Sequence, residues 1–213
     1  IVGLPVYAGR LPNLLLNYLT TWQSNGAWAV PVVVYGNRSY GNALVELYDI
    51  LRYRGFHPIA AAAFVGQHSF TTRLATGRPD REDLEKAEQF SAEIVRRILQ
   101  PGEFTGIKIP GQGAPDYGGY YKPKGRDEEV VNFLKAKPVT TDACIDCRRC
   151  AKVCPMGAIR LDHPSEVSGI CIKCNACVKQ CPVHAKQLTD EAYLSHVGFL
   201  ENRYTSRARI ELF

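Results

Sequence analysis

The cysteines are the residues of this chain whose type and spacing could do chemistry. All eight lie between Cys144 and Cys181, and the rest of the 213 residues contain none. The first four occur in the run CIDCRRCAKVCP, at intervals of three, three and four residues. A secreted disulfide scaffold would scatter its cysteines through a small loop-rich domain. Clustering in one segment instead predicts metal ligation by thiolates in a reducing compartment, which indicates a cytoplasmic protein.

The cysteine run is duplicated. CIDCRRCAKVCPMGA at 144–158 matches CIKCNACVKQCPVHA at 171–185 in the pattern C-I-x-C-x-x-C-x-K-x-C-P-x-x-A. Each half has the C-x2-C-x2-C-x3-C-P spacing of a bacterial [4Fe–4S] ferredoxin, in which the fourth cysteine ligates the other cluster. The spacing therefore predicts two [4Fe–4S] clusters with crossed ligands. We expect one cluster on Cys144, Cys147, Cys150 and Cys181, and the other on Cys171, Cys174, Cys177 and Cys154.

Structural zinc is the competing interpretation of these cysteines. Zinc sites usually combine two C-x2-C pairs across a longer spacer on one tetrahedral ion. Three cysteines in one tight run, followed by a Cys-Pro pair, do not fit that arrangement. Stoichiometric zinc without sulfide would nevertheless reverse the assignment.

Charge and hydropathy exclude several classes of function. The formal net charge is +5, which is too small and too dispersed to predict nucleic-acid binding. No apolar run approaches the ~18 residues that a membrane helix needs, so we expect no membrane insertion. We interpret the cations around the cysteines as a solvated surface that balances anionic clusters; a docking face for an acidic redox partner is the alternative. They are Arg148, Arg149, Lys152, Arg160, Lys173, Lys179 and Lys186.

The first hundred residues alternate short apolar runs with amphipathic stretches, which predicts strands and helices in turn. We expect strands at 1–7, 30–35 and 59–65 and helices at 12–23, 42–54 and 80–99. Alternation of this kind favours parallel β-α-β units with a sheet covered on both faces. Asp80 is the expected cap of the last helix. The residues of that helix expected to point inward are Leu84, Ala87, Phe90, Ile94, Val95 and Ile98.

The remaining segments differ in composition. Residues 101–137 are rich in glycine and proline and are expected to be a linker wrapped over the surface, 138–189 the cluster-binding domain, and 190–213 a C-terminal tail with one more helix. The predicted fold class is therefore α/β for residues 1–100, with three layers α/β/α, followed by an α+β ferredoxin domain with two [4Fe–4S] clusters.

Three loops follow the expected strands: PVYAGR at 5–10, YGNRSY at 35–40 and FVGQHSF at 64–70. Ligands of open α/β sheets bind outside the carboxyl ends of the strands. The rings of Tyr7, Tyr35 and Tyr40 could flank a flat ligand, and backbone amides near Gly9 and Gly36 could bond its polar edge. Tyrosines after strands are often plain packing residues, so the loops alone favour this interpretation only weakly.

These loops, GRPDREDL at 77–84 and the doubled cysteine motif resemble the ferrodoxins of anaerobic bacteria and archaea. In that family a flavodoxin-like domain is fused to a two-cluster ferredoxin, and the resemblance covers nearly the whole chain. It implies that two loops flank the isoalloxazine of FMN. The residues it assigns to FMN are Pro5, Val6, Tyr7, Ala8, Gly9, Tyr35, Gly36, Asn37, Arg38 and Tyr40.

Two features depart from the family pattern. No counterpart of its phosphate-binding loop precedes Ile1, and the first strands of the domain have no counterpart either. We therefore expect FMN in the intact protein and not in this chain alone. In addition, Arg148 and Asn175 stand where ferredoxins often have glycine, and asparagine tolerates a left-handed backbone better than arginine.

Three functions compete on this basis. The first is an electron carrier that relays low-potential electrons between redox partner proteins. The second is a flavin and iron–sulfur oxidoreductase that reduces a small molecule, although no nucleophile–base pair and no G-x-G-x-x-G fingerprint is visible. The third is a redox sensor or a structural iron–sulfur module, which would call for an effector domain. The sequence favours the carrier.

Overall fold

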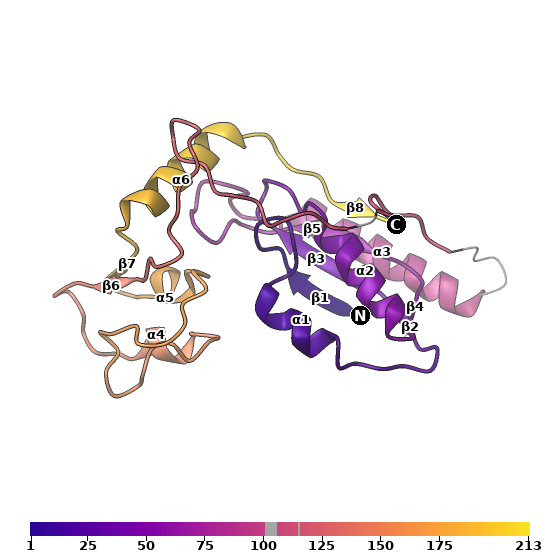
Figure 1. The fold of residues 1–213 in the computed structure, drawn as a ribbon, viewed down its shortest axis with the longest axis horizontal. Helices are drawn as coiled ribbons and strands as arrows, with labels where there is room; N and C mark the ends of the chain where they lie inside the picture. Colours follow the sequence, from indigo (N-terminus) through magenta and orange to yellow (C-terminus); the bar gives the residue numbers. More distant parts are fainter. Residues whose placement is uncertain (101–105, 115) are drawn as a thin grey trace. The chain divides into compact units, whose positions relative to one another are not determined.

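The computed structural model describes residues 1–100, 106–114 and 116–213. Residues 101–105 and 115, which belong to the expected linker, lie outside the described residues. The chain divides into two compact units (Figure 1). The α/β unit comprises residues 1–68, 73–121 and 204–213, and the cluster-binding unit comprises residues 69–72 and 122–203.

The α/β unit is built on a four-stranded sheet with the strand order β1-β3-β5-β8. The first three strands are parallel neighbours, with Val2 opposite Pro31 and Val32 opposite Ala62. A second, two-stranded parallel pair joins β2 to β4. The elements of this unit are β1 Val2–Pro5, α1 Asn13–Leu19, β2 Trp28–Ala29, β3 Pro31–Tyr35, α2 Ala43–Tyr53, β4 His57–Pro58, β5 Ala62–Val65, α3 Arg81–Leu99 and β8 Glu211–Leu212. The unit is thus mixed α/β with a largely parallel sheet, and the expected strands and helices are confirmed to within a few residues.

Helices cover both faces of the sheet because successive strand residues point to opposite sides. Val33 and Leu47 share one core cluster with residues of α1 and α2. Val32, Phe64 and Phe90 belong to a second cluster, formed against α3. The three layers are therefore α1 and α2, then the sheet, then α3.

The buried stripe of α3 differs from the expected one. Phe90 and Ile94 are buried as predicted, but Leu84, Val95 and Ile98 are exposed. The prediction was wrong for these three because the helix is rotated so that buried Asp83 faces inward. A single helix presents only one stripe to the sheet, and the flanking apolar residues remain at the surface.

The rotation of α3 follows from a buried ion pair. The Arg78 guanidinium donates from Nε to Asp83 Oδ2 at 2.7 Å, and both side chains are almost fully buried. Asp80 is the N-cap, as predicted: its carboxylate accepts from Asp83 N, and the Asp83 carboxylate accepts from Asp80 N. This reciprocal pair satisfies two amide donors at the start of the helix.

The C-terminal segment returns to the α/β unit, which the sequence did not predict. Its last residues form β8, which pairs antiparallel with β5, Ala62 opposite Leu212. The loop after β3 binds the same segment, since Asn37 Nδ2 donates to the carbonyl of Tyr204 at 2.7 Å.

The cluster-binding unit consists of short elements around the cysteines. β6 and β7 pair antiparallel, Val139 opposite Gln187 and Thr140 opposite Lys186. An aromatic cluster packs against α6, the longest helix of this unit. The ring centroid of Tyr193 lies 5.0 Å from that of Phe70 and 5.6 Å from that of Phe133. The elements are β6 Val139–Thr140, α4 Arg149–Lys152, α5 Ala176–Lys179, β7 Lys186–Gln187 and α6 Glu191–Arg203.

Candidate iron–sulfur site

Two small cavities in the cluster-binding unit divide the eight thiols between them. The first encloses about 320 Å³ of empty space, its open mouth included, and the second about 370 Å³. The first is lined by Cys144, Cys147, Cys150 and Cys181. The second is lined by Cys171, Cys174, Cys177 and Cys154. Each cavity thus receives three thiols from one half of the duplication and the fourth from the other half.

The duplication is visible in the backbone that positions the thiols. α4 and α5 are each preceded by a residue in the left-handed region, Arg148 with φ 61° and Asn175 with φ 57°. Asp146 and Lys173, two residues earlier in each half, also have positive φ. These conformations turn the chain sharply between successive cysteines, so that three thiols of one run line the same cavity. The departure from glycine noted in the sequence therefore falls on strained positions.

Backbone amides bond the fourth sulfur of each half. Ala158 N donates to Cys154 Sγ at 3.3 Å, and Ala185 N donates to Cys181 Sγ at 3.2 Å. Burial, the largest single influence on Cys181, raises the pKa of its thiol, but hydrogen bonds from the backbone near Lys186, Val183 and Ala185 outweigh it. The net effect lowers that pKa. Donors aimed at sulfur stabilise the thiolate form, which is the form that ligates metals.

Two other thiols are buried and have the opposite shift. Burial raises the pKa of Cys177 to about 11 and raises that of Cys150, and neighbouring cysteines raise both further. Nearby Lys186 opposes the shift in both. Several thiols so close together repel one another as thiolates unless a metal neutralises them, so the donor set fits an iron–sulfur cluster.

A cubane cluster makes a different geometric demand from a single ion. In the described part of the chain, no group of three or more His, Cys, Asp or Glu side chains has the arrangement of a single-ion site. A cubane presents four irons, each of which takes one thiolate, so its ligands surround a body larger than an ion. A cavity walled by four thiols meets that demand.

Comparison with known families gives the same class of domain. Residues 143–185 match the family described as a 4Fe-4S dicluster domain. The chain therefore contains a ferredoxin-type iron–sulfur module with metal-binding cysteines. No curated protein and no solved structure matches the chain.

The loops assigned to FMN lie at the carboxyl ends of β1 and β3, which are neighbouring parallel strands. Asn42, two residues beyond the second loop, donates from N to the carbonyl of Gly9 in the first loop at 2.9 Å, which holds the two segments close. Their polar side chains are bonded within the α/β unit: Tyr35 Oη donates to the carbonyl of Arg209 and Tyr40 Oη to the carboxylate of Glu211. The structure thus brings the two loops together but turns the hydroxyls of Tyr35 and Tyr40 toward the C-terminal segment.

The guanidinium of Arg38, which lies between Tyr35 and Tyr40 in the sequence, packs against an aromatic ring and not against the C-terminal segment. It lies 4.0 Å from the centre of the Tyr121 ring, and Tyr121 N donates to the carbonyl of Ala8. Residues 117–121 of the expected linker therefore cover this end of the sheet.

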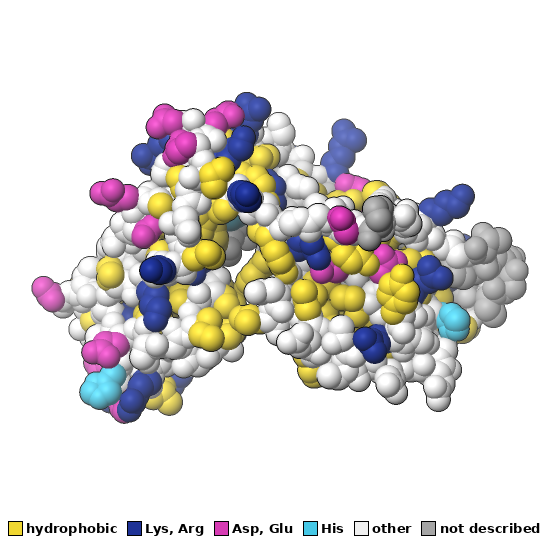
Figure 2. All heavy atoms as spheres, viewed as in Figure 1, with side chains coloured by type: hydrophobic (Ala, Val, Ile, Leu, Met, Phe, Trp, Pro, Cys, Tyr) yellow, Lys and Arg dark blue, Asp and Glu magenta, His cyan; other side chains and the backbone are white. Residues whose placement is uncertain are grey.

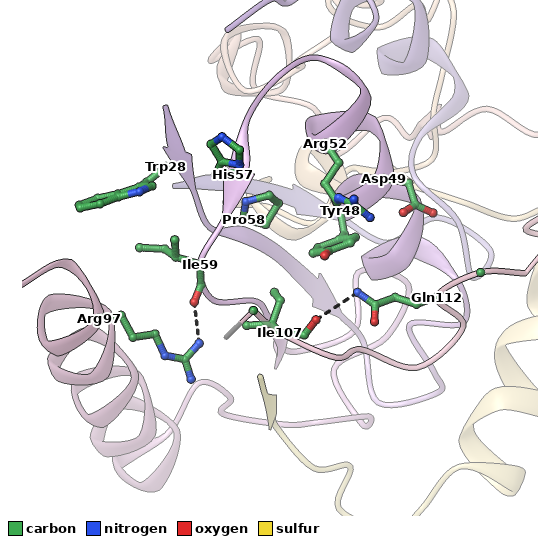
Figure 3. A pocket seen from close by; sticks show the side chains of 12 residues that line it. Trp28, Tyr48, Asp49, Arg52, His57, Pro58, Ile59, Arg97, Ile107 and Gln112 are labelled. Carbon is green, nitrogen blue, oxygen red and sulfur yellow. Dashed lines mark hydrogen bonds between the residues drawn. The ribbon is translucent and has the colours of Figure 1, made fainter. Parts of the chain in front are cut away.

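A larger hollow in the α/β unit lies elsewhere. It encloses about 1460 Å³ of empty space, its wide mouth included, and residues of β2, β4 and α2 line it (Figure 3). β2 and β4 precede β3 and β5 in the chain, so the hollow is at the amino ends of the strands, opposite the proposed flavin loops. Arg97 donates to the carbonyl of Ile59, and Gln112 to that of Ile107 (Figure 3). These side chains therefore form hydrogen bonds to the backbone of the hollow's own wall.

The sequence suggested that the cations around the cysteines form a solvated surface, but one of them is buried. Lys and Arg side chains are interspersed with Asp and Glu over the face shown in Figure 2. Lys186, however, is 2% exposed and lines the first cavity. The signal that could have found it is the duplication itself, because the matching residue of the first half is Ile159. None of the described helices is long and apolar enough to cross a membrane.

Proposed function

We propose that this protein relays single electrons through two [4Fe–4S] clusters, taking them from one redox partner protein and passing them to another in the cytoplasm. The proposed ligands are Cys144, Cys147, Cys150 and Cys181 for the first cluster and Cys171, Cys174, Cys177 and Cys154 for the second. The observation that carries the proposal is the sharing of each cavity between the halves of the duplication, three thiols from one and the fourth from the other.

Each cluster, when bound, accepts and releases one electron at iron. The chain contributes the thiolates, the left-handed turns that aim them and the amide donors on Cys154 and Cys181. Because the fourth thiol comes from the other half, each cluster joins the two halves of a small domain. Metal ligation therefore supplies much of the folding free energy of that unit.

Paired cysteine variants test the crossed assignment. The C147A/C181A double variant removes two ligands from the same proposed cluster and leaves four thiols around the second cavity. We expect it to keep about four irons and one magnetically isolated [4Fe–4S] signal after reduction. The matched C147A/C154A variant removes one ligand from each proposed cluster and should retain no four-thiolate cluster. The reverse pattern would refute the crossed assignment, and wild-type chain that takes up no iron and sulfide under anaerobic reconstitution would refute the relay.

We further propose a flavodoxin-like character for the α/β part, with FMN held between loops 5–10 and 35–40. What supports this is that both loops follow neighbouring parallel strands and that Gly9 of the first accepts a hydrogen bond from Asn42, just beyond the second. In chain order the proposed parts are 1–100, the connecting segment 101–137, the ferredoxin domain 138–189 and the C-terminal segment 190–213, which contributes α6 and β8. Flavin analysis of the purified protein is the test. The fluorescence of FMN should be quenched on binding, and a Gly36→Trp variant should not bind it. Purified protein that neither contains nor takes up flavin would contradict the proposal.

A further inference from the structure

The position five residues after the fourth cysteine of each half carries different side chains. In the first half this residue is Ile159, five after Cys154, and in the second it is Lys186, five after Cys181. Both are buried, with 4% and 2% of their surface exposed. Each lines the cavity of its own fourth cysteine, Ile159 the second cavity and Lys186 the first. The duplication thus sets an apolar side chain beside one cavity and a cation beside the other.

The ammonium of Lys186 is fixed in place. Nζ donates to Thr140 Oγ1 at 2.5 Å and to the carbonyl of Ser165 at 3.1 Å. Both acceptors are neutral, so these bonds orient the charge without cancelling it. Lys186 lines the first cavity together with Cys144, Cys147, Cys150 and Cys181, so its charge lies beside the ligands of that cluster.

The second cavity has a cation of a different kind. Lys173 lines it, but its Nζ donates to the carbonyls of Leu134 and Cys171, in a partly exposed position. Solvent and salt screen a charge near the surface far more than one that is buried. The charge of Lys186 is therefore expected to act more strongly on its neighbouring cluster than the charge of Lys173 does on the other.

We propose that Lys186 raises the reduction potential of the cluster held by Cys144, Cys147, Cys150 and Cys181, so that the two clusters of this protein are unequal. The inference rests on the proposed electron relay. Reduction of one cluster takes one electron from a low-potential donor and no proton, and the charge of the cluster with its four thiolates changes from about −2 to about −3. A buried positive charge stabilises the more negative state, and the potential rises. With both clusters bound, the one held by Cys144, Cys147, Cys150 and Cys181 would be reduced first.

Charge-neutral and charge-preserving variants of Lys186 test this. Lys186→Gln keeps a hydrogen-bond donor for Ser165 and removes the charge, whereas Lys186→Arg keeps the charge. Lys152→Gln removes an exposed lysine from α4 and is the matched control. Reconstituted full-length protein is titrated with dithionite under electron paramagnetic resonance, with iron and sulfide measured on the same samples.

We expect Lys186→Gln to lower the equilibrium constant for reduction of the higher-potential cluster at least tenfold, which is about 59 mV for a one-electron couple. Lys186→Arg and Lys152→Gln should stay within twofold of wild type, and the effect should persist in salt on the order of 1 M. A loaded Lys186→Gln protein with unchanged potentials overturns the inference. So does loss of clusters in both Lys186 variants, because the residue would then be a packing requirement. Absence of iron and sulfide from wild type would instead refute the relay itself.

Discussion

The buried ion pair between Arg78 and Asp83 gives a quantitative prediction for the α/β unit. Their side chains are 3% and 1% exposed, and Asp83 also accepts from the amide of Asp80 at 3.0 Å. Removal of one partner leaves the other as a buried, unpaired charge, which costs about 3–5 kcal/mol. An asparagine keeps the shape and part of the hydrogen bonding, so we expect Asp83→Asn to cost about 3 kcal/mol, or roughly a 150-fold change in the folding equilibrium.

Tryptophan fluorescence can follow this unit by itself. Both tryptophans of the chain, Trp22 and Trp28, lie in the α/β unit, and the cysteines lie in the other. Urea unfolding monitored by fluorescence therefore reports on the unit that contains the ion pair. Glu85→Gln is the matched control, because Glu85 pairs with Arg81 on an exposed face of the same helix. Exposed pairs contribute less than about 1 kcal/mol.

The effect of Asp83→Asn should depend on pH in a defined direction. The hydrogen bond from Arg78 lowers the pKa of Asp83, so the folded pKa lies below the unfolded value of about 3.9. A depressed folded pKa adds stability that is present above the unfolded pKa and is lost as the pH falls through the folded pKa. The difference between wild type and variant should therefore be full near about pH 6 and shrink below about pH 4. A loss under about 1 kcal/mol near neutrality would refute the role given to the pair.

Three other perturbations have expected outcomes. Arg148→Gly should stabilise the cluster-loaded protein by about 1 kcal/mol, because glycine adopts the left-handed backbone without the strain of arginine. Asn175→Gly should destabilise it by about 1 kcal/mol, because Asn175 donates a hydrogen bond to Tyr193 Oη at 2.9 Å. The loss of visible cluster absorption in urea measures both effects. Leu47→Ala, at a fully buried site, should cost about 2–5 kcal/mol by tryptophan fluorescence. Iron removal by a chelator should abolish hydrogen-exchange protection in 122–203 and preserve it in the sheet.

Each of these has a contrary result. Equal effects of glycine at 148 and 175 would show that the hydrogen bond from Asn175 to Tyr193 does not outweigh the relief of backbone strain. A Leu47→Ala protein as stable as wild type would mean that the cluster of apolar residues around α2 is not the core of its unit. Protection retained in 122–203 after iron removal would mean that this unit folds without metal.

The sequence specified the local features of both units. Short apolar runs were enough to locate β1, β3 and β5. β3 and β5 are mostly buried parallel strands, which must be nearly continuous in apolar residues, and β1 is a half-exposed edge strand. The Asp80 cap followed from the residue that precedes an amphipathic run, since an N-cap depends only on its own turn of helix. The cysteine spacing likewise predicted the kind of domain at 143–185, because ligands within one tight run are positioned by local backbone geometry.

Contacts between distant residues were decided by the tertiary structure. The inward face of α3 depended on the Arg78–Asp83 pair and not on apolar spacing alone, and the pairing of β8 with β5 joins residues about 150 apart, for which no local pattern exists. For Lys186 the duplication gave one hint of burial, the matching Ile159, but the pairing of β6 with β7 is what places its ammonium beside Thr140. A side chain's surroundings are set by whichever segment packs against it, and one sequence position does not contain that information.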